Sequence, residues 1–510
     1  MNAALLPLVV MVPLISAALL AAVPGPRWLR GVLLLAPNLG ALAAGVLLIQ
    51  ATADGSVYAH GIALWQDGIA IPFVVDVFSA LMVTTTALLT VTCSAFAIAT
   101  GEDRARFFGS LVLVLSAGVY GALLTGDLFN LFVFIEVMLL PSYGLLAMAG
   151  ALRSLRGGRI YVTVNLLTST IFLAGVALVY GVAGTVHLGE LIGAARESPL
   201  VAAAMAVVLL ALSIKAAVVP VHGWLARTYP ATSPAVTALF SGLHTKVAIY
   251  AIYRLYALLF EGDATYLWIG LVAFTVTMAI GVLGAVGENT TRSILVFHMI
   301  SQIGYILLGV ALFTPLGLMA GIFYLIHHMI VKASLFLSTG AIENAYGTSR
   351  LDRLGGIARR EPILALVFMG AALSLAGLPP FSGFVAKLTL VSATFEAGQW
   401  IVAAVAVAVS LITLMSMLKI WGGPFWGTEP DSDGRSDREV RSGSAPGGVS
   451  APARPTVQPK VRPAVLFPAL VLTTATLCIG LGAEVLLDLS AQAASGLLDP
   501  AAYLEAVTNR

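Results

Sequence analysis

Charged residues are scarce in this chain. Of its 510 residues, 10% are Asp, Glu, Lys or Arg and 59% are hydrophobic, whereas ordinary soluble domains are about 25% charged. This composition excludes a soluble globular enzyme and a largely disordered chain. The net charge is only +2, so the sequence shows no basic surface of the kind that binds nucleic acid.

Cysteine is rarer still, with two residues in the whole chain. Cys93 and Cys478 both lie in apolar runs and form neither a CxxC pair nor a metal-ligand spacing. They are typical of small hydrophobic core residues. A disulfide framework is therefore excluded, and we expect neither a metal site nor a bound cofactor.

Long apolar runs, in contrast, are abundant. A bilayer core needs about 20 apolar residues per helix, and we count fourteen candidate runs. The first lacks a basic segment and a cleavage site, so we expect a membrane helix and not a removable signal peptide. The runs cover residues 2–23, 29–51, 72–99, 107–125, 127–150, 160–184, 200–228, 233–260, 266–286, 291–313, 316–341, 362–396, 400–422 and 463–487. The sequence thus predicts an all-α polytopic membrane protein.

Arginine marks one side of the predicted membrane. Alternate loops contain Arg27, Arg30, Arg104, Arg106, Arg153, Arg156, Arg159, Arg292, Arg350, Arg353, Arg359 and Arg360. The opposite loops contain Asp54, Asp67, Glu190, Glu261, Asp263 and Glu396, with Arg196 as the main exception. Because cytoplasmic loops are enriched in basic residues, we expect the arginine loops in the cytoplasm and both termini outside, in a bacterial plasma membrane.

One segment breaks this pattern of apolar runs and short loops. Residues 428–462 are rich in Pro, Gly, Ser and charged residues. This composition cannot form a packed core, and it predicts a flexible cytoplasmic linker before the last helix. A regulatory or partner-binding tail is the alternative.

Lysine is nearly absent from the loops. The chain has six lysines, and five of them lie within apolar helices: Lys215, Lys246, Lys332, Lys387 and Lys419. Arginine stays protonated at almost any depth, whereas a desolvated lysine can lose its proton near neutral pH. A charge at the bilayer centre is costly and normally faces the bundle interior or a wet cavity. These lysines therefore suggest a titratable relay.

Other titratable groups accompany the lysines. Glu136 stands alone in an apolar helix, and His328 precedes Lys332 by one helical turn. His298 shares a helix face with Ser301. A lone buried histidine is more often a hydrogen-bonded core residue than a relay member.

Two charged residues can also be explained by a structural role alone. Lys419 lies near a helix end, from which it could equally well reach the interface. For Arg254 we expect a structural ion pair or a position at the outer interface.

Two predicted helices contain breaks. The seventh reads LALSIKAAVVPVHGWLARTYP around Pro220, and the twelfth reads AALSLAGLPPFSGFVAKLTLV around Pro379 and Pro380. Proline removes a backbone hydrogen bond and clashes with the preceding turn, so each helix is expected to unwind there. Unwound backbone at membrane depth is tolerated only where it is buried or lines a hydrated cavity.

The two breaks resemble each other. They match when Gly223 is aligned with Gly383, 160 residues and five helices further on. The other matched pairs are Pro220 with Pro380, Trp224 with Phe384, Leu225 with Val385, Ala226 with Ala386 and Arg227 with Lys387. An odd number of helices between equivalent elements reverses their orientation, so we predict two inverted five-helix repeats with helices 7 and 12 discontinuous. The predicted parts are 1–106 (three helices), 107–260 (first repeat), 266–422 (second repeat), 428–462 (linker) and 463–510 (last helix and tail).

The segment SIKAAVVPVHGWLARTYPATSPAVTALFSGLHTKVAIYAIYR resembles the central motif of the antiporter-like, proton-translocating membrane subunits. These subunits occur in respiratory complex I, membrane-bound hydrogenases and Mrp-type multisubunit Na+/H+ antiporters. The resemblance implies a proton relay of Glu136, Lys215, Lys246, His298, His328, Lys332 and Lys387. Accessory roles fall to Lys419, His222, His244 and Ser301. The broken-helix residues are Pro220, Gly223, Pro379, Pro380 and Gly383.

Within this family, GDLFNLFVFIEVMLLPSYGLL is most similar to the D-type subunits of Mrp antiporters. The resemblance implies secondary transport and not enzyme activity, with a larger A-type homologue and several small membrane subunits as partners. We expect Na+ to cross elsewhere in the complex, because the row of cationic groups would repel a metal cation.

Three alternatives stay open at this point. The nearest is a proton-pumping subunit of a redox-driven complex, such as complex I or a membrane-bound hydrogenase. The others are a scaffold subunit with a vestigial channel and a secondary carrier for an organic solute.

Overall fold

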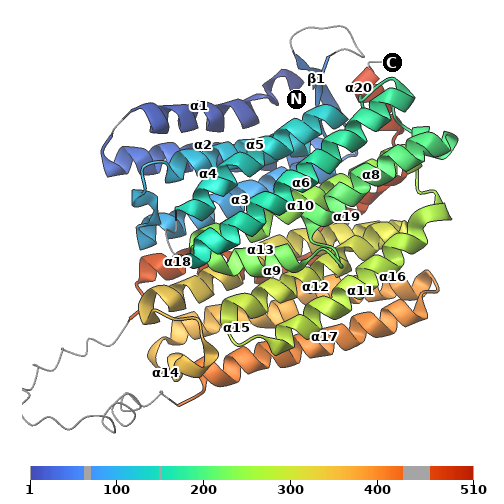
Figure 1. Ribbon diagram of the computed structural model, residues 1–510. Helices are drawn as coiled ribbons and strands as arrows, with labels where there is room; N and C mark the ends of the chain where they lie inside the picture. Colours follow the sequence, from blue (N-terminus) through green and yellow to red (C-terminus); the bar gives the residue numbers. More distant parts are fainter. Residues whose placement is uncertain (1, 24, 63–69, 149–151, 429–459, 509–510) are drawn as a thin grey trace, which may run out of the picture.

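The computed structural model describes residues 2–23, 25–62, 70–148, 152–428 and 460–508, with the side chains of 152–154 excepted. The chain forms a bundle of roughly parallel and antiparallel helices (Figure 1). The α-helices are α1 (Leu8–Ala22), α2 (Arg27–Thr52), α3 (Val77–Thr100), α4 (Phe108–Leu124), α5 (Leu128–Ala147), α6 (Leu152–Ala183), α7 (Ala194–Glu197), α8 (Pro199–Ala216), α9 (Gly223–Thr228), α10 (Pro234–Phe260), α11 (Leu267–Gly287), α12 (Thr291–Leu312), α13 (Pro315–Tyr346), α14 (Ile357–Arg360), α15 (Pro362–Ala376), α16 (Ser382–Glu396), α17 (Trp400–Ile420), α18 (Pro463–Leu481), α19 (Ala483–Leu498) and α20 (Ala501–Thr508).

Twelve helices in the described part of the chain are long and apolar enough to cross a membrane. Two shorter apolar helices, α4 and α15, accompany them. The predicted all-α polytopic fold is therefore confirmed. The predicted number of fourteen spans stays a prediction, because length and composition alone do not place a helix in a bilayer.

A small hairpin departs from the predicted pattern. Strands β1 (Tyr58–Gly61) and β2 (Pro72–Val75) pair antiparallel, with Tyr58 opposite Val75. We predicted one helix over 72–99, but the helix begins only at Val77. Its N-cap is Asp76, whose side chain accepts the backbone N–H of Ser79 at 2.9 Å. The Pro and β-branched residues before this cap favour the extended strand.

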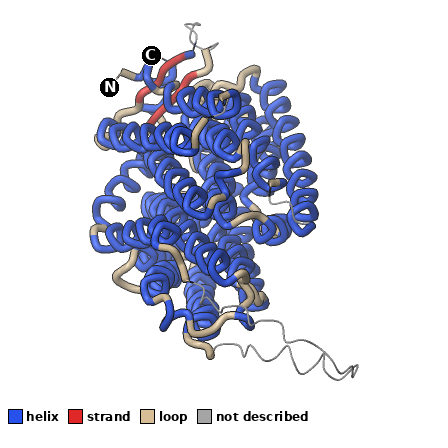
Figure 2. The backbone as a smooth tube through the Cα atoms, turned by 90° about the vertical axis from the view of Figure 1, so that its left-hand side faces the viewer, coloured by secondary structure: helices blue, strands red, loops and turns tan. Residues whose placement is uncertain are grey.

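Both ends of the chain lie near this hairpin (Figures 1 and 2). The N-terminal turn η1 (Ala3–Leu5) and the C-terminal helix α20 both contact β1.

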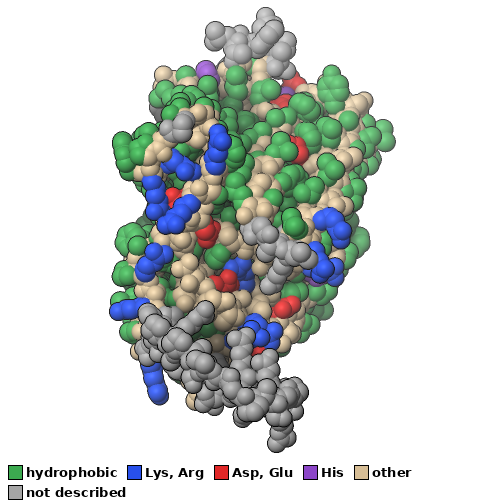
Figure 3. Space-filling view, turned by 60° about the vertical axis from the view of Figure 1, so that its left-hand side comes forward, with side chains coloured by type: hydrophobic (Ala, Val, Ile, Leu, Met, Phe, Trp, Pro, Cys, Tyr) green, Lys and Arg blue, Asp and Glu red, His purple; other side chains and the backbone are tan. Residues whose placement is uncertain are grey.

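The predicted structural ion pair of Arg254 is confirmed, since its guanidinium lies 2.7 Å from Asp76. Lys and Arg side chains gather on the face that comes forward in Figure 3, as the one-sided arginine loops lead one to expect.

Among the described residues, the helices α10, α12 and α13 at the centre of the bundle are the most deeply buried. The most apolar windows of α10 and α13 are 100% buried, and that of α12 is 94% buried. The equivalent windows of α6 and α11 are only 33% buried. The predicted relay residues Lys246, His298 and Lys332 lie on these three central helices, away from lipid.

The two predicted helix breaks are present. Helix α8 ends at Ala216 and α9 begins at Gly223, while α15 ends at Ala376 and α16 begins at Ser382. Each first segment is closed by a residue in the left-handed conformation, Ala217 (φ 64°) and Gly377 (φ 90°). The peptide bonds before Pro220 and Pro380 are both cis.

The two aligned glycines differ in what surrounds them. A Cβ on Gly383 would lie 1.7 Å from the Ser374 carbonyl oxygen, so only glycine fits there. A Cβ on Gly223 would meet nothing within 4 Å. Close backbone packing therefore accompanies the second break, in which Pro379 and Pro380 lead into α16.

The last helix is longer than predicted. We expected it to end near residue 487, but α18 and α19 follow each other with a single residue, Gly482, between them. Helix α18 packs against α3, α13, α15 and α16. Most of the predicted linker 428–462 lies outside the described residues, and the division of the chain into two repeats stays a prediction.

Candidate functional site: a buried row of lysine and histidine

Four titratable side chains lie at the centre of the bundle. Lys246 on α10, His298 on α12, and His328 and Lys332 on α13 are all 0% exposed. Both His328 and Lys332 lie within electrostatic range of Lys246, and His298 lies within range of Lys332. We call these four residues the central row.

Each lysine of the central row has one hydrogen-bond acceptor. The Lys246 Nζ donates to Thr245 Oγ1 at 3.0 Å, and the Lys332 Nζ donates to the Leu295 carbonyl at 2.8 Å. These neutral acceptors neutralise neither charge. Two ammonium groups with no carboxylate bonded to them disfavour each other's protonated state, so the row favours a shared proton over two full charges.

On one side of the row, Glu136 on α5 and Lys215 on α8 approach the same face of α6. Ser169 donates a hydrogen bond to Glu136, and the Lys215 Nζ donates to Asn165 Oδ1 at 3.4 Å. The acid and the lysine lie within electrostatic range, yet none of the ion pairs among the described residues joins them. Asn165 and Ser169 are one helical turn apart, so α6 offers each charged group a neutral partner.

His244 joins this side of the site to α6. Its Nδ1 lies 2.9 Å from the Tyr161 hydroxyl, which lies 3.0 Å from Ser142 Oγ on α5. His222, by contrast, lies in the break between α8 and α9 and is half-buried. His244 is therefore the accessory histidine that faces Lys215, with which it interacts electrostatically.

On the other side of the row, Lys387 on α16 reaches back across the second break. Its Nζ donates to the carbonyl of Ala376, the last residue of α15, at 2.9 Å. It also lies 5.6 Å from the centre of the Tyr305 ring. The neighbouring His327 on α13 has its Nδ1 2.8 Å from Ser382 Oγ at the start of α16. Through His327, α13 is tied directly to the second broken helix.

Three predicted residues have more local contacts. The His298 Nε2 lies 3.0 Å from Ser416 Oγ on α17, so this histidine extends the row outward. Ser301 donates to the Met278 carbonyl of α11 at 2.9 Å and serves helix packing. Lys419 is exposed and donates to the carbonyls of Val286 and Glu288 at the end of α11, away from the central row.

Several buried polar atoms along this path have no partner in the described part of the structure. They are both ring nitrogens of His328, Nδ1 of His298, Nε2 of His244 and Nε2 of Gln302. Buried polar groups are nearly always hydrogen-bonded to protein or to water. Water is the usual partner of such groups where no protein group is in reach.

Sequence reasoning missed several members of the site. Tyr161, Asn165 and Ser169 follow each other at four-residue spacing on α6, so a helical-face analysis of this run would have found them. His327 was passed over in favour of its neighbour His328, and only the packing of α13 shows that His327 is the one that contacts Ser382. No group of three or more described His, Cys, Asp or Glu residues could hold a metal ion.

Comparison with known proteins places these residues in a family. A family model described as "NADH:quinone oxidoreductase/Mrp antiporter, TM" matches residues 125–413. A D-type subunit of a Na(+)/H(+) antiporter from Alkalihalophilus pseudofirmus is 37% identical over 91% of this chain and 92% of its own length. The chain belongs to the family of D-type Mrp antiporter subunits.

Other members of this D-type family agree with the assignment. The D-type Na(+)/H(+) antiporter subunit of Bacillus subtilis is 33% identical and covers 98% of both chains. A chain in the structure of the Mrp complex from Dietzia sp. DQ12-45-1b is 55% identical, with a TM-score of 0.93 and 100% coverage of both chains. This is a family of antiporter subunits and not of enzymes, and its members work within a multisubunit complex.

Proposed function

We propose that this chain carries protons for an Mrp-type Na+/H+ antiporter, through Glu136, Lys215, the central row and Lys387. The observation that supports this proposal is the burial of four titratable residues on the three innermost helices. A structural core has no need of two adjacent lysines without a carboxylate partner, because unpaired buried charge destabilises a fold.

The first broken helix supplies a gate for this relay. When Glu136 pairs with Lys215, the lysine is held charged and repels a proton from Lys246. When the pair opens, Ser169 receives the acid and Asn165 the lysine; the hydrogen bonds of these two residues to Glu136 and Lys215 support this step. Lys246 can then accept a proton. Because α6 stabilises the open arrangement, the switch needs only side-chain movement.

The partners of the chain are the A-type homologue and the small membrane subunits of the antiporter, in a bacterial plasma membrane with both termini outside. Sodium crosses elsewhere in the complex, since the cationic central row repels a metal ion. The name of the matching family also covers redox-driven complexes, but the relatives that are 37% and 33% identical over most of this chain are antiporter subunits.

The decisive experiment separates transport from assembly. Antiport is measured in everted vesicles as the Na+-induced collapse of a pH gradient. Glu136→Ala is expected to abolish it while the complex co-purifies intact. The matched control is Glu190→Ala, an exposed acid outside the relay. Full antiport in the assembled Glu136→Ala complex would refute the relay.

A second measurement separates the antiporter from the redox-driven alternative. The tagged chain is purified in mild detergent and its partners are identified by mass spectrometry. Small membrane subunits with an A-type homologue support the proposal, whereas iron–sulfur, flavin or nickel subunits contradict it.

A further inference from the structure

An open apolar groove lies between α1 and α2 at the edge of the bundle, where α1 is the outermost helix in Figure 1. Its volume is about 510 Å³. The lining includes Pro13 and Ser16 on α1, and Pro37, Gly40 and Ala44 on α2. These small residues leave an open groove between the two helices.

A basic cleft adjoins one end of this groove. The cleft has a volume of about 470 Å³ and is lined by the α1–α2 turn together with Arg30 and Arg106. The two spaces are neighbours, because Leu20 of the cleft is one turn beyond Ser16 of the groove, and Arg30 is two residues before Val32 of the groove. An apolar channel thus leads to two guanidinium groups.

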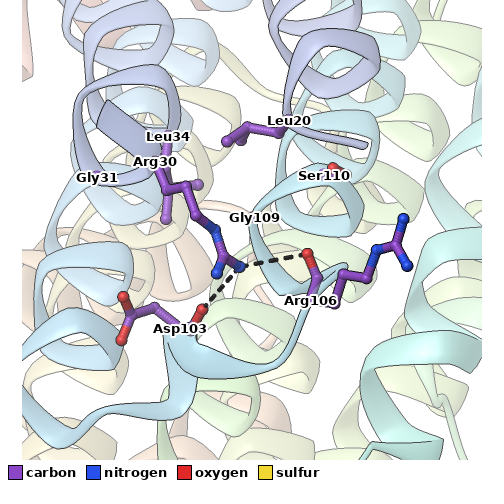
Figure 4. A pocket seen from close by; sticks show the side chains of 8 residues that line it. All are labelled: Leu20, Arg30, Gly31, Leu34, Asp103, Arg106, Gly109 and Ser110. Carbon is purple, nitrogen blue, oxygen red and sulfur yellow. Dashed lines mark hydrogen bonds between the residues drawn. The ribbon is translucent and has the colours of Figure 1, made fainter. Parts of the chain in front are cut away.

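The positive charge of the cleft is not neutralised by the nearby acid. Asp103 is paired with Arg27 at 3.2 Å. The Arg30 Nη2 donates to the backbone carbonyls of Asp103, Ala105 and Arg106, each at 3.3 Å. Figure 4 shows the bonds to Asp103 and Arg106, which hold the Arg30 side chain in place. In the same view the Arg106 guanidinium points away from Arg30. Carbonyl contacts leave the charge of Arg30 in place, and no ion pair among the described residues includes Arg106.

Two exposed aromatic residues mark the depth of the cleft in the membrane. Trp28 at the start of α2 is 70% exposed, and Phe107 before α4 is 45% exposed. The Arg106 guanidinium lies 5.0 Å from the centre of the Phe107 ring. Exposed aromatic rings are typical of the membrane–water interface. The cleft therefore lies at the level of lipid headgroups.

The groove has the length of one lipid leaflet. Its α2 lining runs from Val32 to Ala44, which is ~18 Å at the rise of an α-helix. Half of a typical hydrocarbon core is ~15 Å. A partner helix is ~10 Å in diameter. Its apolar surface would face the two arginines and leave their charge unpaired.

We propose that this corner binds an anionic phospholipid from the leaflet on the arginine side. The phosphate binds in the cleft that Arg30 and Arg106 line, and one acyl chain occupies the groove between α1 and α2. The lipid supplies both the anion and the apolar chain that the two adjoining spaces require, which neither a free phosphate nor a partner helix does.

The first test removes the charge. The assembled complex is incubated with vesicles of phosphatidylglycerol and phosphatidylcholine in equal parts, re-purified, and its bound lipid is quantified by mass spectrometry. The double variant Arg30→Gln/Arg106→Gln is expected to retain about tenfold less phosphatidylglycerol. Arg104→Gln is the matched control, since Arg104 is exposed on the same loop and lines neither space. An equal loss in the control would overturn the proposal.

The second test fills the groove and keeps the arginines. A Cβ on Gly40 meets nothing within 4 Å, so Gly40→Leu is compatible with the fold and places its side chain in the groove. Gly181→Leu on α6 is the matched control, because Gly181 is equally unobstructed and lines no groove. Only Gly40→Leu is expected to lose the lipid. Unchanged phosphatidylglycerol in Gly40→Leu, or a photo-crosslink from the groove to a partner subunit in place of lipid, would refute it.

Discussion

The two broken helices hold their lysines in different ways. In the first, Lys215 precedes the break, in the last turn of α8, and bonds to the side chain of Asn165 with Glu136 nearby. In the second, Lys387 follows the break and donates to the carbonyl that ends α15. The two breaks therefore present one lysine to a side-chain partner and the other to the carbonyl at a helix end.

This difference indicates at which break an ion pair is expected to form and open. An acid and a lysine that each have a neutral alternative partner can pair and separate. No carboxylate contacts Lys387 among the described residues, and a helix-end carbonyl does not titrate. We infer that the first break contains the gate. At the second break, the Ala376 carbonyl holds Lys387 at a fixed position, where this lysine binds the transferred proton.

The largest expected effect comes from breaking the gate. Lys215→Ala is expected to lower antiport by ~100-fold or more, the usual scale for losing a proton-transfer group. Because the two residues act as one unit, Glu136→Ala/Lys215→Ala is expected to be no worse than either single variant. The measurement is the vesicle antiport assay, and additive losses would show that the two residues work separately.

At the second break, Lys387→Glu is expected to lower antiport by about tenfold or more. A carboxylate cannot donate to the Ala376 carbonyl, and a charged hydrogen bond of this kind is worth ~1.5–3 kcal/mol. Lys419→Glu is the matched control, since Lys419 also donates to helix-end carbonyls but is exposed. A similar loss in both variants would place the effect in helix capping and not in the relay.

A smaller effect is expected from the link between α13 and the second broken helix. Ser382→Ala removes the partner of His327, a neutral hydrogen bond worth ~1 kcal/mol, so antiport should fall about fivefold. His327→Ala in the same background should add little beyond this loss. Independent losses in the double variant would mean that the two side chains do not act through their mutual contact.

The smallest effect concerns the backbone at the two breaks. Ala217 adopts the left-handed conformation that glycine occupies at position 377. Ala217→Gly should therefore raise the free energy of unfolding by ~1 kcal/mol, measured as the thermal midpoint of the complex in detergent. Ala216→Gly, within the helix, should lower it by a similar amount. Equal shifts for both variants would contradict the strain at Ala217.

Much of the fold could be predicted because bilayer thickness imposes its own length on each apolar run. The β1–β2 hairpin escaped because its strands are only four residues long and adjoin an apolar helix. The ends of α13 and α19 were misjudged because polar residues continue both helices beyond the apolar stretch. Tertiary contacts fix such ends, and composition does not record them.

The charged members of the candidate site could be predicted because a charge in an apolar membrane helix is energetically costly, so a lysine there indicates a function. Serine, asparagine and tyrosine carry no such cost, so Ser169, Asn165 and Tyr161 gave no comparable signal. Which of two adjacent histidines faces the second broken helix depends on the rotation of α13 about its axis. That rotation is set by packing against α16, which the sequence does not display.

The position of the last helix has a consequence for synthesis of the chain. Helix α18 fills a place between α3, near the beginning, and α13, α15 and α16. Helix α19 then covers α13, α3 and α10. The side of the central helices that α18 and α19 cover therefore stays exposed until the ribosome has released the C-terminal segment. Biogenesis has to protect a nearly finished bundle from lipid and water, and a protein truncated before Pro463 should be recognised by quality-control proteases as incomplete.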